Sequence, residues 1–383
     1  MKKLFFVFVF FYVLIPNVSS QNFVQNIRGV VIDKQSQSPM PDVNIMVLNS
    51  SPVIGTTTDI NGKFVLSKIH IGRVGVQFSF IGYNQIVINN LVLTSGKELI
   101  LNISMEETVN VLKDITIISQ RDKENPLNKM ATVSARSFSI DETNRYAGTI
   151  GDPSRMAANF AGVSIAGDSR NDIIIRGNSP TGLLWRLDGI NIPNPNHFGS
   201  LGTTGGPVSI LNNNLLDNSD FMTGAFPAEY GNALSGAFDL RLRTGNNEDS
   251  EFMGQIGFNG FELGAEGPFC KNRKGSYLVN YRYSTLGVME AFGIKFGYSS
   301  IPQYQDISFK VDIPTTGTKY GRFTLFGIGG LSNIALLDKN KKEGDFTVTP
   351  FNQDVNYYSN MGVLGFSHTY FFNEKTYHTI IQR

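Results

Sequence analysis

Residues 171–192 read NDIIIRGNSPTGLLWRLDGINI and combine two short apolar runs with an Arg-Gly and an Asp-Gly step. Apolar and polar residues alternate on both sides of Asp188-Gly189, which is the strongest short-range signal for a β-hairpin. In a plain hairpin, Asp188 and Gly189 form the turn, and Arg176 ends a buried strand where it meets solvent. The pattern also allows Arg176 and Asp188 to lie at a domain interface, and these residues alone leave both interpretations open.

The composition of the chain favours strands and turns over helices. Its 383 residues include 39 Gly, 29 Phe and 14 Tyr, and the length suits more than one domain of about 100–200 residues. The formal net charge of +1 argues against a nucleic-acid partner, because such proteins usually show a basic excess. Cys270 is the only cysteine, so neither an intrachain disulfide nor a cysteine zinc cluster can form.

Residues 1–20 have the pattern of a secretory signal peptide. Lys2 and Lys3 precede an apolar run at residues 4–15, and small residues follow at 18–20. The run is short for a membrane span, and an N-terminal anchor helix is the alternative. No later stretch approaches the ~20 apolar residues that a transmembrane helix requires, so we expect an exported chain without a helical span.

Residues 21–105 alternate short strand-like runs with turn signals, which predicts a small β-sandwich. Residues 56–64 indicate a strand, an Asn-Gly turn and a second strand. Three segments in order, GVVIDKQSQSPMPDVNIMVLN, GTTTDINGKFVL and VQFSFIGYNQ, resemble the carboxypeptidase-regulatory-like domain, a transthyretin-like sandwich. The resemblance implies a structural or interaction module and does not imply peptidase activity.

No pattern in the chain indicates an enzyme. The four histidines, His70, His197, His368 and His378, are scattered and form no HExxH pair, so no metal site is predicted. Neither a GxSxG elbow nor a GxxxxGKS/T loop occurs. We therefore expect no catalytic residues and no cofactor.

Residues 106–128 form a predicted linker that contains one short β-prone run, Asp114, Ile115, Thr116, Ile117, Ile118 and Ser119. Charged residues follow at 121–124. An isolated run of this kind can add as a strand to the sheet edge of a partner. It can equally be the last strand of the sandwich or a plain linker, since such runs are common.

Residues 129–245 carry three spaced motifs, IIIRGNSPTG, WRLDGINIPNPNHF and FPAEYGNALSGAFDLRLRTG. In this order they resemble the plug domain of TonB-dependent outer-membrane receptors. The resemblance implies polar contacts between the plug and the barrel wall, for which the matching residues here are Arg176, Asp188, Glu229 and Arg241. The glycine and tyrosine positions of the plug motifs are Gly177, Gly189, Tyr230, Gly231 and Gly236.

The resemblance also favours a functional role for the run 114–119, because the family carries the segment bound by TonB just before its plug. TonB transmits energy from the inner membrane and would add to this run as a strand. The run lacks the valines that are usual in that segment. Residues 193–198 and 202–207 are loop-like and are predicted to form the plug apex.

After residue 245 the polar and apolar residues alternate with a period of two. Residues 306–313, DISFKVDI, place Asp306 and Lys310 on one face and Ile307 on the other, as a transmembrane β-strand requires; a half-buried soluble sheet is the alternative. Short connections are predicted to be periplasmic, and the long ones at 286–304 and 331–355 extracellular. About seven strands fit residues 246–383, against the ~22 of plugged transporters. We therefore expect a fragment of a longer barrel or a truncated gene product.

The sequence thus predicts a mainly β chain: a small N-terminal β-sandwich, an α+β plug domain, and the first strands of a transmembrane antiparallel β-barrel. The predicted function is a TonB-dependent receptor or transporter in the cell outer membrane, with its sandwich in the periplasm. The expected partners are TonB with its inner-membrane energy complex, outer-membrane lipid, a surface lipoprotein, and an unknown small-molecule, glycan or peptide ligand. A secreted or surface adhesion protein without transport is the alternative.

Overall fold

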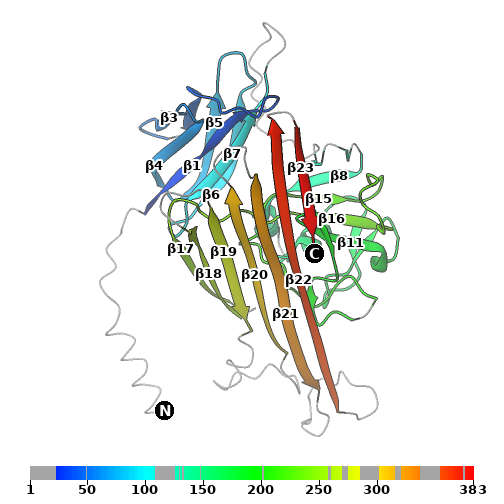
Figure 1. The fold of residues 1–383 in the computed structure, drawn as a ribbon. Helices are drawn as coiled ribbons and strands as arrows, with labels where there is room; N and C mark the ends of the chain where they lie inside the picture. Colours follow the sequence, from blue (N-terminus) through cyan, green and yellow to red (C-terminus); the bar gives the residue numbers. More distant parts are fainter. Residues whose placement is uncertain are drawn as a thin grey trace, which may run out of the picture. The chain divides into compact units, whose positions relative to one another are not determined.

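The structure is a computed structural model, and it describes residues 23–48, 50–107, 126–128, 130–131, 133–146, 148–200, 202–257, 260–269, 275–284, 302–314, 321–336, 354–373 and 376–383. The chain divides into two compact units, Met1–Arg121 and Asp122–Arg383. Figure 1 labels their strands along the chain. The predicted signal peptide and the predicted TonB-contact run 114–119 lie outside the described residues.

The first unit is a small β-sandwich. Its two sheets have the strand orders β4-β1-β7 and β3-β2-β5-β6. The strands are β1 (Val24–Asp33), β2 (Asn44–Leu48), β3 (Gly55–Thr57), β4 (Lys63–His70), β5 (Gly72–Ser79), β6 (Ile86–Leu93) and β7 (Leu99–Met105). Side chains of both sheets share one apolar core, in which the rings of Phe64 and Phe78 meet edge to face with centroids 5.5 Å apart. Buried and exposed residues alternate along β2, as the period of two in a strand requires.

The Asn-Gly turn predicted in this unit is present, and it crosses between the sheets. Asp59 accepts hydrogen bonds from the backbone amides of Asn61 and Lys63 at 2.9 and 2.8 Å, and Gly62 has a φ of +71°. The strands on its two sides, β3 and β4, do not pair with each other. The reason is that the short strand β3 pairs with β2, while β4 pairs with β1.

Residues 126–246, here called the central region, hold a five-stranded sheet of order β12-β11-β16-β15-β8. Its strands are β8 (Ala135–Phe138), β11 (Leu183–Leu187), β12 (Ile190–Ile192), β15 (Ser219–Met222) and β16 (Gly236–Leu240). The smaller elements are α2 (Ile140–Arg145), α3 (Pro153–Ala157), the 3-10 turn η1 (Pro180–Gly182), and the strand pairs β9 (Val163–Ile165) with β10 (Ile173–Ile175) and β13 (Asn196–His197) with β14 (Val208–Ser209). The central region is therefore a mixed sheet with short helices.

Aromatic rings fill the core of this sheet. Trp185 stacks on Phe238 with ring centroids 4.6 Å apart and an angle of 11° between the planes. Phe221 meets the same Phe238 ring at 4.4 Å. The three rings meet because Phe238 on β16 is the register partner of Trp185 on β11 and of Phe221 on β15. Cross-strand aromatic pairs of this kind stabilise a sheet beyond the area that they bury.

The hairpin predicted around Asp188-Gly189 is confirmed. β11 and β12 pair in antiparallel register, with Trp185 opposite Ile192 and Leu187 opposite Ile190. Asp188 and Gly189 have φ values of +44° and +85°, which are typical of the two-residue turn that matches the twist of the flanking strands. The backbone alone forms this turn, so the Asp188 carboxylate can bind other parts of the protein.

The remaining strands form one antiparallel sheet in chain order, here called the long-stranded sheet; Figure 1 shows β17 to β22 side by side. They are β17 (Glu251–Gly257), β18 (Gly260–Pro268), β19 (Ser276–Tyr283), β20 (Gln303–Pro314), β21 (Arg322–Leu336), β22 (Val355–Asn373) and β23 (Thr376–Gln382). Seven strands within the described residues agree with the predicted number, and the prediction of a mainly β chain is confirmed. Among the described residues, no helix combines the length and the apolar character needed to cross a membrane.

Candidate functional site

The long-stranded sheet has a polar face and an apolar face, and the polar face is the buried one. On β20, Asp306 and Lys310 are buried, whereas Ile307 between them is 45% exposed. On β17, Phe252 and Ile256 are 74% and 84% exposed. Sheets of water-soluble proteins usually show the opposite arrangement, with the apolar face packed inward.

The central region covers the buried polar face, and the residues that meet there are here called the polar interface. From the sheet these are Glu262, Glu266, Asn280, Arg282, Asp306, Lys310 and Ser332; from the central region they are Asp188, His197, Asn212 and Arg243. The contact also has an apolar part: Leu278, Phe326 and Ile328 of the sheet join the core of the central region, and Met361 and Val363 pack against it. Ionic and hydrogen-bonding groups therefore share this contact with apolar side chains.

Asp188 joins the hairpin turn to β20. Its Oδ2 accepts from Lys310 Nζ at 2.9 Å, and its Oδ1 accepts from the Leu242 backbone amide at 3.0 Å. Lys310 Nζ also donates to the Leu242 carbonyl at 2.6 Å, which closes the network. Of the four residues that the sequence predicts as plug–barrel contacts, Asp188 is the one that the described structure places against the sheet.

His197 makes a second link, from β13 to β20 and β21. Its Nε2 lies 2.9 Å from Asp306 Oδ2 and its Nδ1 lies 2.8 Å from Ser332 Oγ. Burial lowers the pKa of His197, so the neutral ring donates from Nε2 to Asp306 and accepts at Nδ1 from Ser332. Arg282 also donates to Asp306 Oδ2, at 2.8 Å, and shares that charge.

This Ser-His-Asp grouping is a structural link and not a catalytic triad. A triad needs a serine oxygen that a substrate can reach and donors that receive the developing oxyanion. The His197 side chain is fully buried, and Ser332 Oγ faces the backbone amide of Phe198 at 3.4 Å. The group therefore holds the segment after β13 against the sheet.

Two further contacts tie the later part of the central region to β18 and β19. Arg243 donates to Glu266 through two nitrogens at 2.6 and 2.7 Å, which is the bidentate geometry favoured by arginine and carboxylate. Asn212 Nδ2 donates to Glu262 Oε1 and Asn280 Oδ1, both at 2.9 Å. A charge pair in such a crowded interface is costly to break on one side alone.

The other three predicted contact residues make their described contacts inside the central region. Arg176 Nη2 donates to Ser134 Oγ at 3.0 Å and to Thr223 Oγ1 at 3.2 Å. Glu229 pairs with Arg186 Nη1 at 3.0 Å. The exposed residue Arg241 donates through its backbone amide to Ser219 Oγ at 3.1 Å. Within the part of the chain that the structure describes, these three side chains show no hydrogen bond or ion pair to the long-stranded sheet.

The predicted motif glycines differ in their surroundings. Gly177 and Gly189 have positive φ, as the tight turns after β10 and β11 require. A Cβ on Gly236 would lie 2.3 Å from Ile175 Cδ1 and 3.0 Å from the Met222 carbonyl, whereas one on Gly231 would meet nothing within 4 Å. Tyr230 donates through its hydroxyl to Asp239 Oδ2 at 2.8 Å, inside the central region.

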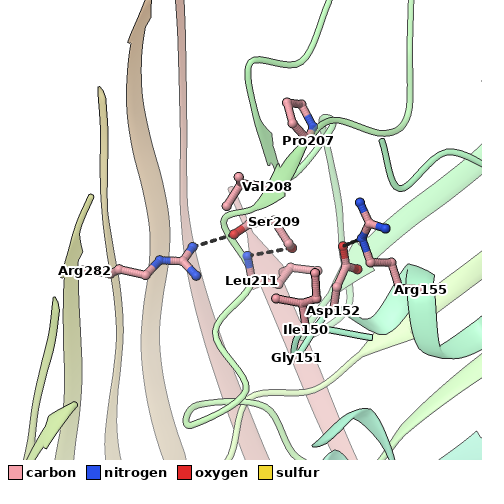
Figure 2. A pocket seen from close by; sticks show the side chains of 9 residues that line it. All are labelled: Ile150, Gly151, Asp152, Arg155, Pro207, Val208, Ser209, Leu211 and Arg282. Atoms are coloured by element: carbon pink, nitrogen blue, oxygen red, sulfur yellow. Dashed lines mark hydrogen bonds and ion pairs between the residues drawn. The ribbon is translucent and has the colours of Figure 1, made fainter. Parts of the chain in front are cut away.

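A small cavity of about 50 Å³ lies beside the polar interface (Figure 2). Its lining includes Asp152, Arg155, Ser209 and Arg282, and Arg282 donates to the Ser209 carbonyl. Burial raises the pKa of Asp152, which accepts from Asn171 Nδ2 at 2.6 Å. Because ligand pockets usually measure about 300–1,000 Å³, this cavity suits ordered water better than a small-molecule ligand.

The described residues also contain no group of three or more His, Cys, Asp and Glu side chains arranged to hold a metal ion. The named residues of the polar interface bind one another through ion pairs and hydrogen bonds. Its chemistry is therefore that of a contact between two parts of one protein.

Half of this interface could be read from the sequence. The strand pattern places Asp306, Lys310, Asn280 and Arg282 on the polar face. In the central region the sequence marks Asp188 but gives no local signal for His197, which reads as one of four scattered histidines. The segment 193–198, predicted as a plug apex, contains it.

Comparisons with known proteins match different parts of the chain. Residues 27–117 match the family model of the CarboxypepD_reg-like domain. No curated protein matches the chain. A ferric enterobactin receptor mutant from Pseudomonas aeruginosa, solved with enterobactin, is similar at 15% identity and a TM-score of 0.40, covering 63% of this chain and 39% of that chain.

A second mutant of the same receptor gives 16% identity and a TM-score of 0.40, covering 66% of this chain and 40% of that chain. A type II cohesin–X-dockerin complex from Acetivibrio cellulolyticus gives 19% identity and a TM-score of 0.19, covering 22% of this chain and 58% of that chain. The chain thus spans about two fifths of the length of the receptors that it matches.

Proposed function

We propose that the chain carries the plug and part of the barrel wall of a TonB-dependent outer-membrane receptor, which imports a ligand of unidentified chemistry. In this proposal the central region is the plug and the long-stranded sheet belongs to the wall. The N-terminal sandwich lies in the periplasm, and residues 114–119 are bound by TonB.

The observation that carries this proposal is that the long-stranded sheet buries its polar face and exposes its apolar face. Its outward face carries Phe252, Ile256 and Ile307, and its inward face carries buried ionic residues such as Asp306 and Lys310. In water the outward face would expose a large apolar surface, which soluble proteins avoid. In lipid the same face is favourable, and a transmembrane strand shows this alternation of apolar-out and polar-in.

The nature of the polar interface supports the plug role. A plug must stay in place at rest and must move when it is pulled, so its contacts need specific geometry without an extensive apolar seal. The Asp188–Lys310, His197–Asp306 and Arg243–Glu266 contacts meet this need. Ion pairs in an interface favour one orientation more than they add net affinity.

A substitution on the outward face tests the membrane location. Ile307→Arg is expected to remove most of the protein from the outer-membrane fraction, because arginine on a lipid-facing strand costs about 2–4 kcal/mol near the bilayer midplane. Ile60→Arg is the matched control, since Ile60 is 86% exposed in the sandwich unit. The measurement is the amount of each variant in fractionated outer membranes. Equal amounts of Ile307→Arg and wild type would contradict the proposal.

A substitution in the run 114–119 tests the TonB contact. Ile117→Pro is expected to weaken binding of the purified TonB carboxy-terminal domain at least about tenfold, because proline removes a backbone donor that an added strand would use. Ile117→Val is the control, since it keeps both the amide and the β-branched side chain. Binding is measured with immobilised full-length chain. The TonB assignment fails if both variants bind as wild type does.

A further inference from the structure

The start of the central region is held by one carboxylate. Asp220 on β15 accepts hydrogen bonds from two consecutive backbone amides, Leu127 at 2.9 Å on Oδ1 and Asn128 at 2.8 Å on Oδ2. Asp220 is 1% exposed, whereas Leu127 is 40% exposed. Residues 126–128 belong to no helix or strand. A buried carboxyl group therefore fixes a piece of main chain whose Leu127 side chain is exposed.

The side chain of Asn128 strengthens the same point of attachment. Its Nδ2 donates to Glu229 Oε1 at 2.6 Å and to the Tyr230 hydroxyl at 2.8 Å. Tyr230 in turn donates to Asp239, which is the register partner of Asp220 on the neighbouring strand β16. The segment is thus attached to two adjacent strands at one place.

This attachment lies between the run 114–119 and the first strand of the central region. Residues 126–128 follow shortly after the run 114–119. A pull on that run reaches residues 126–128 before it reaches β8, the first strand of the central region. Among the described strands, β8 lies at the edge of its sheet, where it pairs with β15. Once the attachment is lost, an edge strand can separate without opening the interior of the sheet.

We propose that Asp220 is a positioning residue for energy coupling: its carboxylate fixes the point at which a pull by TonB enters the central region. This inference rests on the proposed function and adds the site at which the plug yields first. The carboxylate binds one amide on each oxygen, so this single side chain provides both hydrogen bonds. The two bonds together hold the segment until force is applied.

Hydrogen exchange of the full chain tests whether the attachment exists. In Asp220→Ala, the amides of Leu127 and Asn128 are expected to exchange at least about tenfold faster than in wild type, because each loses a bond to a charged acceptor. The amides of Phe221 and Phe238 in the sheet core are expected to keep their rates. Asp217→Ala is the matched control, since the carboxylate of exposed Asp217 accepts from the neighbouring Asn218 amide at 2.7 Å and lies away from residues 126–128 along the chain.

Three outcomes would overturn the inference: unchanged exchange in Asp220→Ala, an equal rise in Asp217→Ala, or an equal rise at Phe221 and Phe238. Should Asp220→Ala fail to fold, Leu127→Pro provides the test, because it deletes one donor in an exposed segment and leaves the carboxylate intact. Faster exchange of the Asn128 amide in that variant is expected. A wild-type rate there would count against the attachment.

Crosslinking separates this inference from the proposed function. A cysteine introduced by Ile115→Cys in a Cys270→Ser background is crosslinked to the purified TonB carboxy-terminal domain, with and without Asp220→Ala. A higher yield with Asp220→Ala is expected, because the carboxylate then no longer holds residues 127 and 128, which follow the run. Equal yields would overturn the positioning role. No crosslink in either protein would reject the TonB assignment itself, while hydrogen exchange would still report the attachment.

Discussion

Replacing Lys310 with methionine is expected to destabilise the central region by about 3–5 kcal/mol, because it leaves Asp188 buried against the sheet without its cation. The lost contacts are the 2.9 Å ion pair to Asp188 and the 2.6 Å hydrogen bond to the Leu242 carbonyl. The free energy of unfolding can be followed in urea by the fluorescence of Trp185. This is the only tryptophan of the chain, and it is buried in the core of the central region.

Two comparisons make this experiment specific. Lys34→Met removes an ion pair of the sandwich unit, to Glu106 at 2.9 Å, in which the two side chains are 45% and 53% exposed. Its loss is expected to cost at most about 1 kcal/mol. The double variant Asp188→Asn with Lys310→Met is expected to recover part of the loss, because no uncompensated charge is then left at the interface. Similar losses for Lys310→Met and Lys34→Met would show that Asp188 is solvated and that the polar interface is not closed.

Replacing Phe238 with alanine is expected to cost about 3–5 kcal/mol, since a large aromatic side chain leaves a cavity in a packed core. Phe238 is fully buried and contacts the rings of both Trp185 and Phe221. The loss of its ring also exposes one face of Trp185. We therefore expect a lower midpoint in urea together with a red-shifted Trp185 emission in the folded state.

Leu234→Ala is the matched control for this second prediction. Leu234 lies just before β16 and is 82% exposed, so its truncation is expected to change the stability by less than about 0.5 kcal/mol. A Phe238→Ala protein with the wild-type midpoint would mean that the three rings do not form the core of this sheet. A loss confined to the emission wavelength, with no change in midpoint, would lead to the same conclusion.

Both predictions concern how the central region is held together. The rings of β11, β15 and β16 pack in the core of its sheet, while Asp188, His197 and Arg243 attach it to the long-stranded sheet. In the proposed function, the central region is the plug, and these polar contacts hold it against the sheet.

The sequence by itself determined the features that depend on neighbouring residues. Alternation along β20 predicted that Asp306 and Lys310 share one face and Ile307 the other, because successive side chains of a strand point to opposite sides. The Asp188-Gly189 step predicted the hairpin, because both residues must take positive φ in a two-residue turn. Such rules act within a few residues and need no knowledge of the rest of the chain.

The tertiary structure alone decided which residues meet across the polar interface. Asp188, Arg176 and Glu229 carry equivalent signals in the sequence, yet Asp188 reaches Lys310 while the other two bind within the central region. His197 pairs with Asp306, from which 109 positions separate it, and no local pattern marks the pair. The physical reason is that strand periodicity fixes the face on which a side chain lies. How one face sits against another depends on packing over the whole of both surfaces.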